Sequence, residues 1–230
     1  GVNDEAAQRH KGIVANPNCT TMAMMMALAP LHHAAGLERL VVSTYQAVSG
    51  TGNKAIAELE EQSSRVLAGE PIDDPKVYPH RIAFNVIPQV ETFKDGDDYT
   101  TEERKVMAET RKILGFGDEV GISATCARVP VVSGHSESIN IQTREDLSPD
   151  RAREILGQVS GVIVVDDPSN GEYPMAIDGA GRDEVLVGRI RRDPSQERCL
   201  NLWLVGDNLR KGAATNAVQV AEVLIENDWL

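Results

Sequence analysis

Residues 12–35, GIVANPNCTTMAMMMALAPLHHAA, contain the pattern on which the fold assignment rests. The first four of these residues predict a short buried strand, which Asn16-Pro17-Asn18 ends in a turn. Residues 20–35 predict a helix that is apolar on nearly every side and is therefore buried. Cys19 is thus expected at the junction between the strand and the N-terminus of the helix.

The rest of the chain mixes predicted strands and helices. Strands are expected at 37–45, 82–87, 121–132, 136–144, 161–165, 185–190 and 199–205. Helices are expected at 55–68, 100–114, 149–158 and 211–227, and a long surface loop at 166–184. Thr100 and Glu103 have the spacing of a capping box. Because several strands follow one another directly, we predict an α+β fold: a mixed, largely antiparallel sheet with helices packed on one face.

Composition limits the class of protein. The 230 residues are 41% hydrophobic and 25% charged, which is typical of a globular chain with a sizeable core. The net charge of −12 argues against a general nucleic-acid surface and against a polybasic membrane surface. The chain has no apolar run of about 18 residues, so no membrane-spanning helix is predicted. Three cysteines without a CxxC pair exclude a disulfide scaffold and indicate reduced thiols, hence a cytoplasmic location.

Cys19 is the sharpest candidate for chemistry. A free cysteine is usually a buried, inert small hydrophobe. At a helix N-terminus, however, unpaired N–H groups and partial positive charge favour the thiolate, which is the nucleophilic form. The preceding turn predicts that Cys19 lies at the rim of a loop. Cys126 and Cys199 fall inside predicted strands, so we interpret both as structural.

His135 is the second candidate. It lies in the turn Ser133-Gly134-His135-Ser136, where a lone histidine is most simply a surface residue. Beside an activated cysteine, however, histidine is the usual acid–base group because its pKa lies near neutrality. No role is assigned to His10, His32, His33 or His80. No HxH, HExxH or carboxylate cluster predicts a metal site.

Further polar residues fall near predicted strand and helix ends. Gln46 and Arg128 are most simply solvated, although the guanidinium of Arg128 has the fork geometry that suits a substrate carboxylate. Glu102 and Lys105 lie three apart on a helix and face one way, which is typical of an ordinary ion pair. Gly50-Thr51-Gly52 is a lone GxG and a weak dinucleotide fingerprint.

Four ordered motifs resemble the aspartate-semialdehyde dehydrogenase family. They are NPNCTT (16–21), TYQAVSG (44–50), RVP (128–130) with SGHS (133–136), and GDNLRKGAA (206–214). They cover the chain nearly from end to end in compatible spacing. The combination is therefore a specific signal, whereas each motif alone is weak.

The resemblance implies a fold, a reaction and residue roles. The fold is that of the C-terminal domain of glyceraldehyde-3-phosphate dehydrogenase-like enzymes. The reaction is the NADPH-dependent reductive dephosphorylation of L-4-aspartyl phosphate to L-aspartate 4-semialdehyde through a thioester on the nucleophilic cysteine. By position, the implied roles are nucleophile for Cys19, acyl orientation for Gln46, acid–base for His135, α-carboxylate binding for Arg128, a substrate-side carboxylate for Glu102, phosphate binding for Asn18 and Lys105, and NADP contact for Ser49, Gly50 and Asn208.

The resemblance also predicts a division of the chain. The family carries a Rossmann-like NADP-binding domain that has no counterpart in this sequence, which starts at Gly1. We expect residues 1–210 to form the catalytic and dimerisation domain. We expect 211–230 to form a helix that packs on the NADP-binding domain through Val218, Ala221, Leu224 and Ile225. The implied partners are the small-molecule substrate and a second copy of the chain, without nucleic acid or membrane, and the chain alone is expected to be inactive.

Three alternatives remain open. N-acetyl-glutamyl-phosphate reductase belongs to the same superfamily, but it tends to carry Gly where this chain has Asn18. A non-catalytic dimerisation module needs no reactive cysteine. A Cys–His hydrolase uses Cys19 and His135 but leaves Gln46, Arg128 and the terminal motif unexplained.

Overall fold

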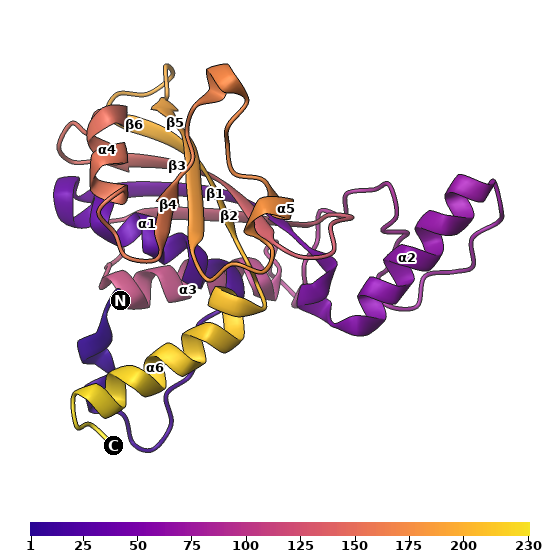
Figure 1. Ribbon diagram of the computed structural model, residues 1–230, viewed down its shortest axis with the longest axis horizontal. Helices are drawn as coiled ribbons and strands as arrows, with labels where there is room; N and C mark the ends of the chain where they lie inside the picture. Colours follow the sequence, from indigo (N-terminus) through magenta and orange to yellow (C-terminus); the bar gives the residue numbers. More distant parts are fainter.

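A six-stranded mixed sheet forms the centre of the computed structural model, which describes residues 1–230 (Figure 1). The strands are β1 (Leu37–Gln46), β2 (Gly121–Arg128), β3 (His135–Thr143), β4 (Val162–Val164), β5 (Val185–Arg192) and β6 (Cys199–Gly206). Their order is β2-β1-β3-β6-β5-β4. The three central pairings are antiparallel, whereas β1–β2 and β4–β5 are parallel. The predicted α+β class with a largely antiparallel sheet is confirmed.

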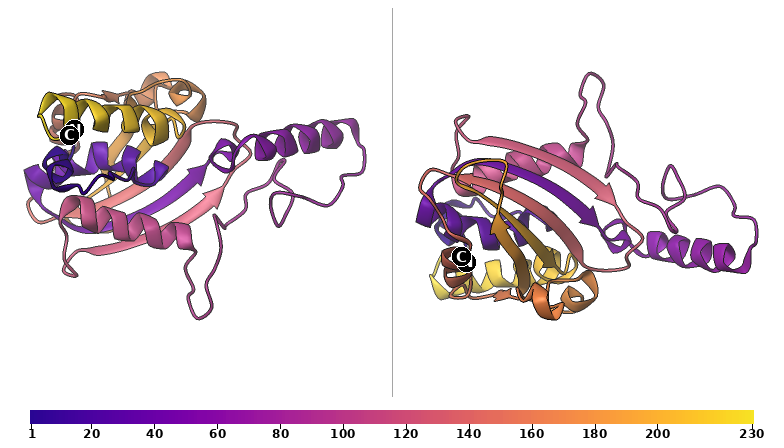
Figure 2. Two further views of the ribbon diagram at one scale, coloured as in Figure 1. Left: turned by 90° about the horizontal axis from the view of Figure 1, so that it is seen from below. Right: turned by 90° about the horizontal axis from the view of Figure 1, so that it is seen from above.

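Three helices, α1, α3 and α4, pack on one face of this sheet. The helices are α1 (Cys19–Ala35), α2 (Asn53–Ala68), α3 (Thr101–Leu114), α4 (Pro149–Leu156), α5 (Ala176–Gly179) and α6 (Thr215–Glu226), with 3-10 turns η1 (Asp4–Arg9), η2 (Val48–Thr51) and η3 (Pro168–Asn170) and a π-helical turn η4 (Arg210–Ala214). Helices α1, α3 and α4 cover the sheet, and α6 joins them through η4 (Figure 2). The opposite face of the central strands carries no long helix (Figure 2).

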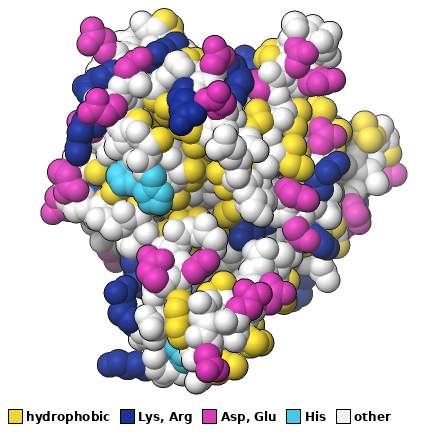
Figure 3. Space-filling view, turned by 60° about the vertical axis from the view of Figure 1, so that its left-hand side comes forward, with side chains coloured by type: hydrophobic (Ala, Val, Ile, Leu, Met, Phe, Trp, Pro, Cys, Tyr) yellow, Lys and Arg dark blue, Asp and Glu magenta, His cyan; other side chains and the backbone are white.

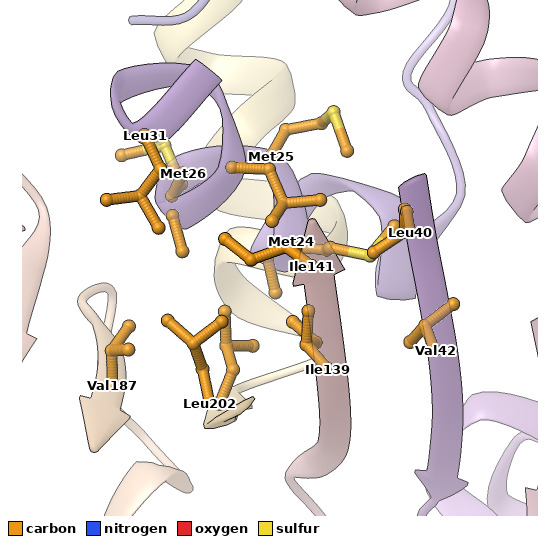
Figure 4. Packing of buried hydrophobic residues seen from close by; sticks show 14 of the residues in the cluster. Met24, Met25, Met26, Leu31, Leu40, Val42, Ile139, Ile141, Val187 and Leu202 are labelled. Atoms are coloured by element: carbon orange, nitrogen blue, oxygen red, sulfur yellow. The ribbon is translucent and has the colours of Figure 1, made fainter. Parts of the chain in front are cut away.

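Helix α1 fills the core because it is apolar all round, as its sequence predicts. Met24 and Leu31 are fully buried and face alternate residues of the strands, among them Leu40 and Ile139 (Figure 4). This alternation follows from the two-residue period of a strand, which sends successive side chains to opposite faces. The N-terminus of α1, and with it Cys19, is thereby fixed at one end of the sheet.

Helix α3 begins as the Thr100–Glu103 spacing predicts. The Thr100 hydroxyl accepts from the Glu103 N–H, and the Glu103 carboxylate accepts from the Thr100 N–H, which completes the capping box. The other oxygen of Glu103 accepts from the Cys126 N–H at 2.9 Å. One carboxylate therefore caps α3 and ties it to β2, which sets the position of the first turn of α3 beside Cys19.

Helix α2 and the loop after it stand away from the sheet (Figures 1 and 2). A small separate core holds them together, comprising Val48, Ala55, Leu59, Ile82, Ala83 and Ile87. The expected strand 82–87 is wrong, because only Ile87 bridges to Arg128 and the N–H groups of Ile82 and Ala83 donate to Gln62 Oε1 instead. A side-chain amide thus satisfies the backbone that a sheet would otherwise pair.

Two further expectations need correction. Residues 12–15 are not a strand: Ile13 is 85% exposed, and the segment is not among the six strands of the sheet. The expected helix 211–227 starts as the π-helical turn η4 and becomes α-helical only at Thr215. Of the apolar face of α6, Val218 and Ile225 are exposed but Leu224 is buried.

The surface carries charges of both signs. On the face shown in Figure 3, acidic and basic side chains are interspersed between apolar patches. None of the helices combines the length and the apolar character needed to cross a membrane.

Candidate active site

Cys19 is the first residue of α1, so its predicted position at the N-terminus of the buried helix is confirmed, whereas the strand predicted before it is absent. Asn18 caps the helix, because its Oδ1 accepts from the N–H groups of Thr20 at 2.9 Å and Thr21 at 3.3 Å. This cap holds the first turn with its partial positive charge directly at the sulfur. The thiol is half-buried, at the rim of the core.

His135 meets Cys19 although 116 residues separate them. The imidazole Nε2 lies 3.4 Å from the Sγ of Cys19. His135 is the first residue of β3 and is only 1% exposed, so the interpretation as a surface turn residue is excluded. The sheet order explains the meeting, because β3 lies in the middle of the sheet beneath α1.

Burial sets the protonation of both groups. It raises the pKa of Cys19 to about 11, and the charge of Glu102 acts in the same direction. The hydroxyl and N–H of Thr20 and the more distant Arg128 favour the thiolate but do not outweigh these effects. Burial, with a contribution from Arg128, lowers the pKa of His135 to about 3. The expected thiolate is therefore not the resting form of this chain: a neutral thiol faces a neutral imidazole.

Glu102 contacts three of the other predicted site residues. Its Oε1 accepts from Asn18 Nδ2 at 2.8 Å and from Gln46 Nε2 at 3.1 Å, and its Oε2 pairs with Lys105 Nζ at 2.9 Å. Burial opposes the charge of Lys105, but hydrogen bonds to Glu91 and Glu102 raise its pKa overall. The interpretation of Glu102 and Lys105 as an ion pair is confirmed, and the carboxylate is nearly buried rather than solvated.

Arg128 is buried at the end of β2 and points its guanidinium at the same centre. Its Nη1 donates to the carbonyl oxygen of Ala47 at 2.7 Å, and its Nε has no protein partner. The N–H of Ala47 donates to His135 Nδ1 at 3.0 Å. Gly50 packs against both side chains, since a β-carbon there would lie 3.2 Å from Arg128 Nη1 and 3.3 Å from His135 Cε1.

Ser49 and Asn208 are buried and bonded to each other. Asn208 Nδ2 donates to Ser49 Oγ at 2.9 Å, and Asn208 Oδ1 accepts from the N–H of Gly134 at 3.1 Å. These bonds join the segments after β1 and β6 to the residue that precedes His135. Both side chains therefore hold the walls of the site together, and Gly50 is the exposed member of the predicted cofactor group.

Glu137 and the main chain of Ala47 also belong to the site, although neither was predicted from the sequence. Glu137 follows His135 by two residues on the same face of β3, is fully buried, and has no hydrogen-bond partner for either oxygen. Burial raises its pKa well above the ordinary value. The two-residue period of the strand was a usable signal for Glu137. A backbone N–H leaves no signal in a sequence.

This arrangement suits nucleophilic catalysis at an acyl carbon. It supplies a cysteine at a helix N-terminus, an imidazole within reach, and cationic side chains that suit an anionic substrate. No group of three or more His, Cys, Asp or Glu side chains is placed to hold a metal ion.

The comparisons with known proteins point in the same direction. Residues 28–211 match the family model for the semialdehyde dehydrogenase dimerisation domain. The chain is 52% identical to the aspartate-semialdehyde dehydrogenase of Aquifex aeolicus over 95% of its own length, and 51% identical to that of Legionella pneumophila over 93%. It spans 64% and 61% of those two relatives, so it corresponds to less than two thirds of their length.

Solved structures agree with this result. Aspartate semialdehyde dehydrogenase II from Vibrio cholerae superposes with a TM-score of 0.92 at 43% identity, covering 98% of this chain and 66% of that one. The same enzyme complexed with ASA also gives 0.92, at 42% identity and the same coverage. The Candida albicans enzyme with NADP, at 24% identity and a TM-score of 0.69, covers 95% of this chain and 59% of that one, and shows the fold alone.

Proposed function

This chain belongs to the aspartate-semialdehyde dehydrogenase family, and we propose from that premise that it forms the catalytic and dimerisation part of such an enzyme. The reaction is the reductive dephosphorylation of L-4-aspartyl phosphate to L-aspartate 4-semialdehyde. The observation that carries the proposal is the 3.4 Å contact between Cys19 Sγ and His135 Nε2 at the N-terminus of α1. Relatives about 50% identical carry the name of this activity.

Cys19 attacks the acyl carbon of the phosphate substrate. A bond forms between Sγ and that carbon, the carbon–oxygen bond to phosphate breaks, and phosphate leaves with the bonding electrons. The N-terminal N–H groups of α1 stabilise the negative oxygen that develops. Gln46, which donates to Glu102, orients the acyl group. His135 acts as the acid–base group for the sulfur, as the family resemblance implies.

The charged side chains bind the two ends of the substrate. Arg128 carries a buried guanidinium whose Nε has no protein partner, so it has capacity for the α-carboxylate. Asn18 and Lys105 hold the phosphate. Glu102 receives the substrate ammonium, which it attracts as a nearly buried carboxylate.

The residues present fit one edge of the NADPH nicotinamide. Gly50 is exposed, and the absence of a β-carbon lets its backbone lie directly against Arg128 and His135. Ser49, the neighbour of Gly50 in the chain, is buried and held by its hydrogen bond to Asn208. When bound, NADPH supplies the hydride of the reduction.

The uncovered face of the sheet suits a second copy of the chain. Tyr45 and Trp203 lie on it half-buried, with ring centroids 5.4 Å apart, and polar residues surround them. We propose a homodimer through this face, in keeping with the dimerisation-domain family model.

Residues 1–210 form the catalytic and dimerisation domain, and 211–230 pack on the NADP-binding domain. The protein acts in the cytoplasm, in the biosynthesis of lysine (through diaminopimelate), threonine and methionine.

The test is phosphate-dependent reduction of NADP by L-aspartate 4-semialdehyde, catalysed by the full-length protein. We expect robust turnover, loss of it in Cys19→Ser, and little turnover with N-acetyl-L-glutamate 5-semialdehyde. Cys199→Ser is the matched control because Cys199 is buried in β6, away from α1. Preference for the acetylated substrate, or unchanged turnover in Cys19→Ser, would overturn the proposal. The chain alone is expected to show negligible turnover.

A further inference from the structure

The π-helical turn η4 packs against the first residue of α1 and leaves no space for a side chain between them. Gly212, in the middle of η4, is buried, and a β-carbon added to it would lie 3.0 Å from the β-carbon of Cys19 and 3.2 Å from the carbonyl oxygen of Cys19. Gly212 does not have a positive φ, so its backbone conformation is open to any residue. What calls for glycine at this position is the close approach to Cys19.

Hydrogen bonds hold η4 on the side that faces away from Cys19. The N–H of Gly212 donates to the carbonyl oxygen of Asp207 at 2.9 Å, five residues back, which is the bond of a π-helix. That same carbonyl oxygen would lie 3.2 Å from a β-carbon at Gly212. The buried carboxylate of Asp207 accepts from three main-chain N–H groups, those of Gly181, Leu209 and Arg210. Because Asp207 is fixed in this way, a side chain at position 212 would push against Cys19.

Side-chain amides tie the loop before Cys19 to the same turn. Asn16 Nδ2 donates to the carbonyl oxygen of Ala213 at 2.9 Å, and Asn16 Oδ1 accepts from Asn216 Nδ2 at 3.0 Å. Asn16 lies only three residues before Cys19 in the chain. The segment that carries the cysteine is therefore joined to η4 twice, by packing at Gly212 and by hydrogen bonds at Asn16.

We propose that η4 sets the position of the nucleophilic sulfur, and that Gly212 is a positioning residue that acts through Cys19 because it has no side chain. The cations proposed to bind the substrate are held elsewhere: Arg128 donates to Ala47, and Lys105 bonds to Glu91 and Glu102. A displacement of Cys19 from the side of η4 therefore slows the chemical step more than it weakens substrate binding. This inference rests on the proposed function and adds a positioning residue to it.

The first test is Gly212→Ala in the full-length protein, where Cys19 must give way by a few tenths of an ångström. We expect kcat to fall about tenfold or more, while KM for the semialdehyde and for phosphate changes less than about threefold. Gly157→Ala is the matched control, because a β-carbon there would lie 3.2 Å from the carbonyl oxygen of Arg153 in α4, which contributes no residue to the site. A native kcat in Gly212→Ala, or an equal loss in Gly157→Ala, would overturn the proposal.

Asn16→Ala takes the place of this variant if Gly212→Ala does not fold. Asn16 is exposed, so its replacement should leave Tm nearly unchanged, but it removes both hydrogen bonds to the η4–α6 segment. We expect kcat to fall about threefold or more. The control is Asn227→Ala, an exposed asparagine whose Nδ2 donates to the carbonyl oxygen of Val223 at 2.9 Å. Equal kcat values for the two asparagine variants would then overturn the proposal.

A stability cycle tests the contact without turnover. Gly212→Ala should lower Tm, and it should lower Tm by less in a Cys19→Gly background, which lacks the β-carbon that the new methyl group would meet. An equal drop in Tm in the two backgrounds would overturn the proposal. Because Tm needs no substrate, absent turnover in the native protein together with the smaller drop in Cys19→Gly would reject only the proposed reaction.

Discussion

Gly50 lies against His135 so closely that a β-carbon at position 50 would be 3.3 Å from the imidazole Cε1 and 3.2 Å from Arg128 Nη1. Neither side chain has room to retreat, because the main chain of Ala47 holds both. We therefore expect Gly50→Ala to misplace the two groups and to lower kcat/KM by about 10- to 100-fold. Steady-state kinetics of the full-length protein measure this effect.

The control for Gly50 is Gly121→Ala on β2. A β-carbon at Gly121 would have its nearest neighbour at 3.9 Å, which is ordinary van der Waals contact. This variant should keep both its kinetics and its Tm. Equal kinetics for the two alanine variants would show that Gly50 is not needed for the arrangement of the site.

Glu102 is expected to suppress the reactivity of Cys19 in the substrate-free protein. Its negative charge helps burial to raise the pKa of the thiol from 9.0 to about 11. Glu102→Gln removes that charge, so the thiolate fraction at pH 8 should increase and alkylation of Cys19 by iodoacetamide should become faster. In the native protein the rate should climb from pH 8 through pH 11, as the thiol ionises.

Glu91→Gln is the matched control for this measurement. Glu91 also pairs with Lys105 but is not among the groups that act on Cys19. Mass spectrometry of the labelled peptides separates Cys19 from Cys126, whose buried thiol has its pKa raised to about 12. If Glu102→Gln and Glu91→Gln alkylate at the same rate, the charge of Glu102 does not govern the thiol.

Glu137 is expected to make the folded protein less stable as the pH rises. Burial holds its folded-state pKa well above 4.5, so its contribution to stability is complete below pH 4.5 and is lost as the pH rises through the folded-state value. Glu137→Gln mimics the uncharged acid. The variant should be more stable than the native protein by about 1–3 kcal/mol at pH 8, and this gain should shrink toward pH 4.5. Urea unfolding at several pH values measures it.

Glu60→Gln, an exposed change on α2, controls for the loss of one negative charge. A Glu137→Gln variant that is less stable than the native protein at pH 8 would show that the carboxylate is charged and partnered in the folded state. A gain that is the same at every pH would also contradict the burial argument.

The hydrophobic patterns predicted the fold well, because an apolar face has to be buried against another element, however distant that element is in the sequence. The apolar run of α1 and the alternation of β3 each require a partner surface, and together they allow few arrangements. The predicted strand at 12–15 was wrong because so short an apolar run does not by itself identify a strand, and here its Ile13 is exposed. The predicted strand at 82–87 was wrong because the side chain of Gln62 accepts hydrogen bonds from the N–H groups of Ile82 and Ala83, which a neighbouring strand would otherwise pair.

The site could be predicted only in part for a related reason. Side chains such as Cys19 and His135 are visible in a sequence, and their motifs indicate where they lie. Their protonation is not visible in a sequence. It depends on burial and on the hydrogen bond from the Ala47 N–H to His135, and both form only when α1, β1 and β3 come together. The prediction of a resting thiolate at Cys19 was therefore wrong, although the predicted position of Cys19 at the helix N-terminus was right.

Trp203 provides the test of the proposed dimer. It stacks obliquely on Tyr45 on the uncovered face of the sheet, where Ser138 of β3 lies opposite it in register. Trp203→Lys places a charge in the middle of that face, and burying an unpaired charge between two chains is costly. We expect sedimentation equilibrium at micromolar concentration to show a monomer, whereas the native protein and the control Trp229→Lys, near the C-terminus, remain dimeric. A dimeric Trp203→Lys protein would place the contact elsewhere, and a monomeric native protein would remove the homodimer from the proposed function.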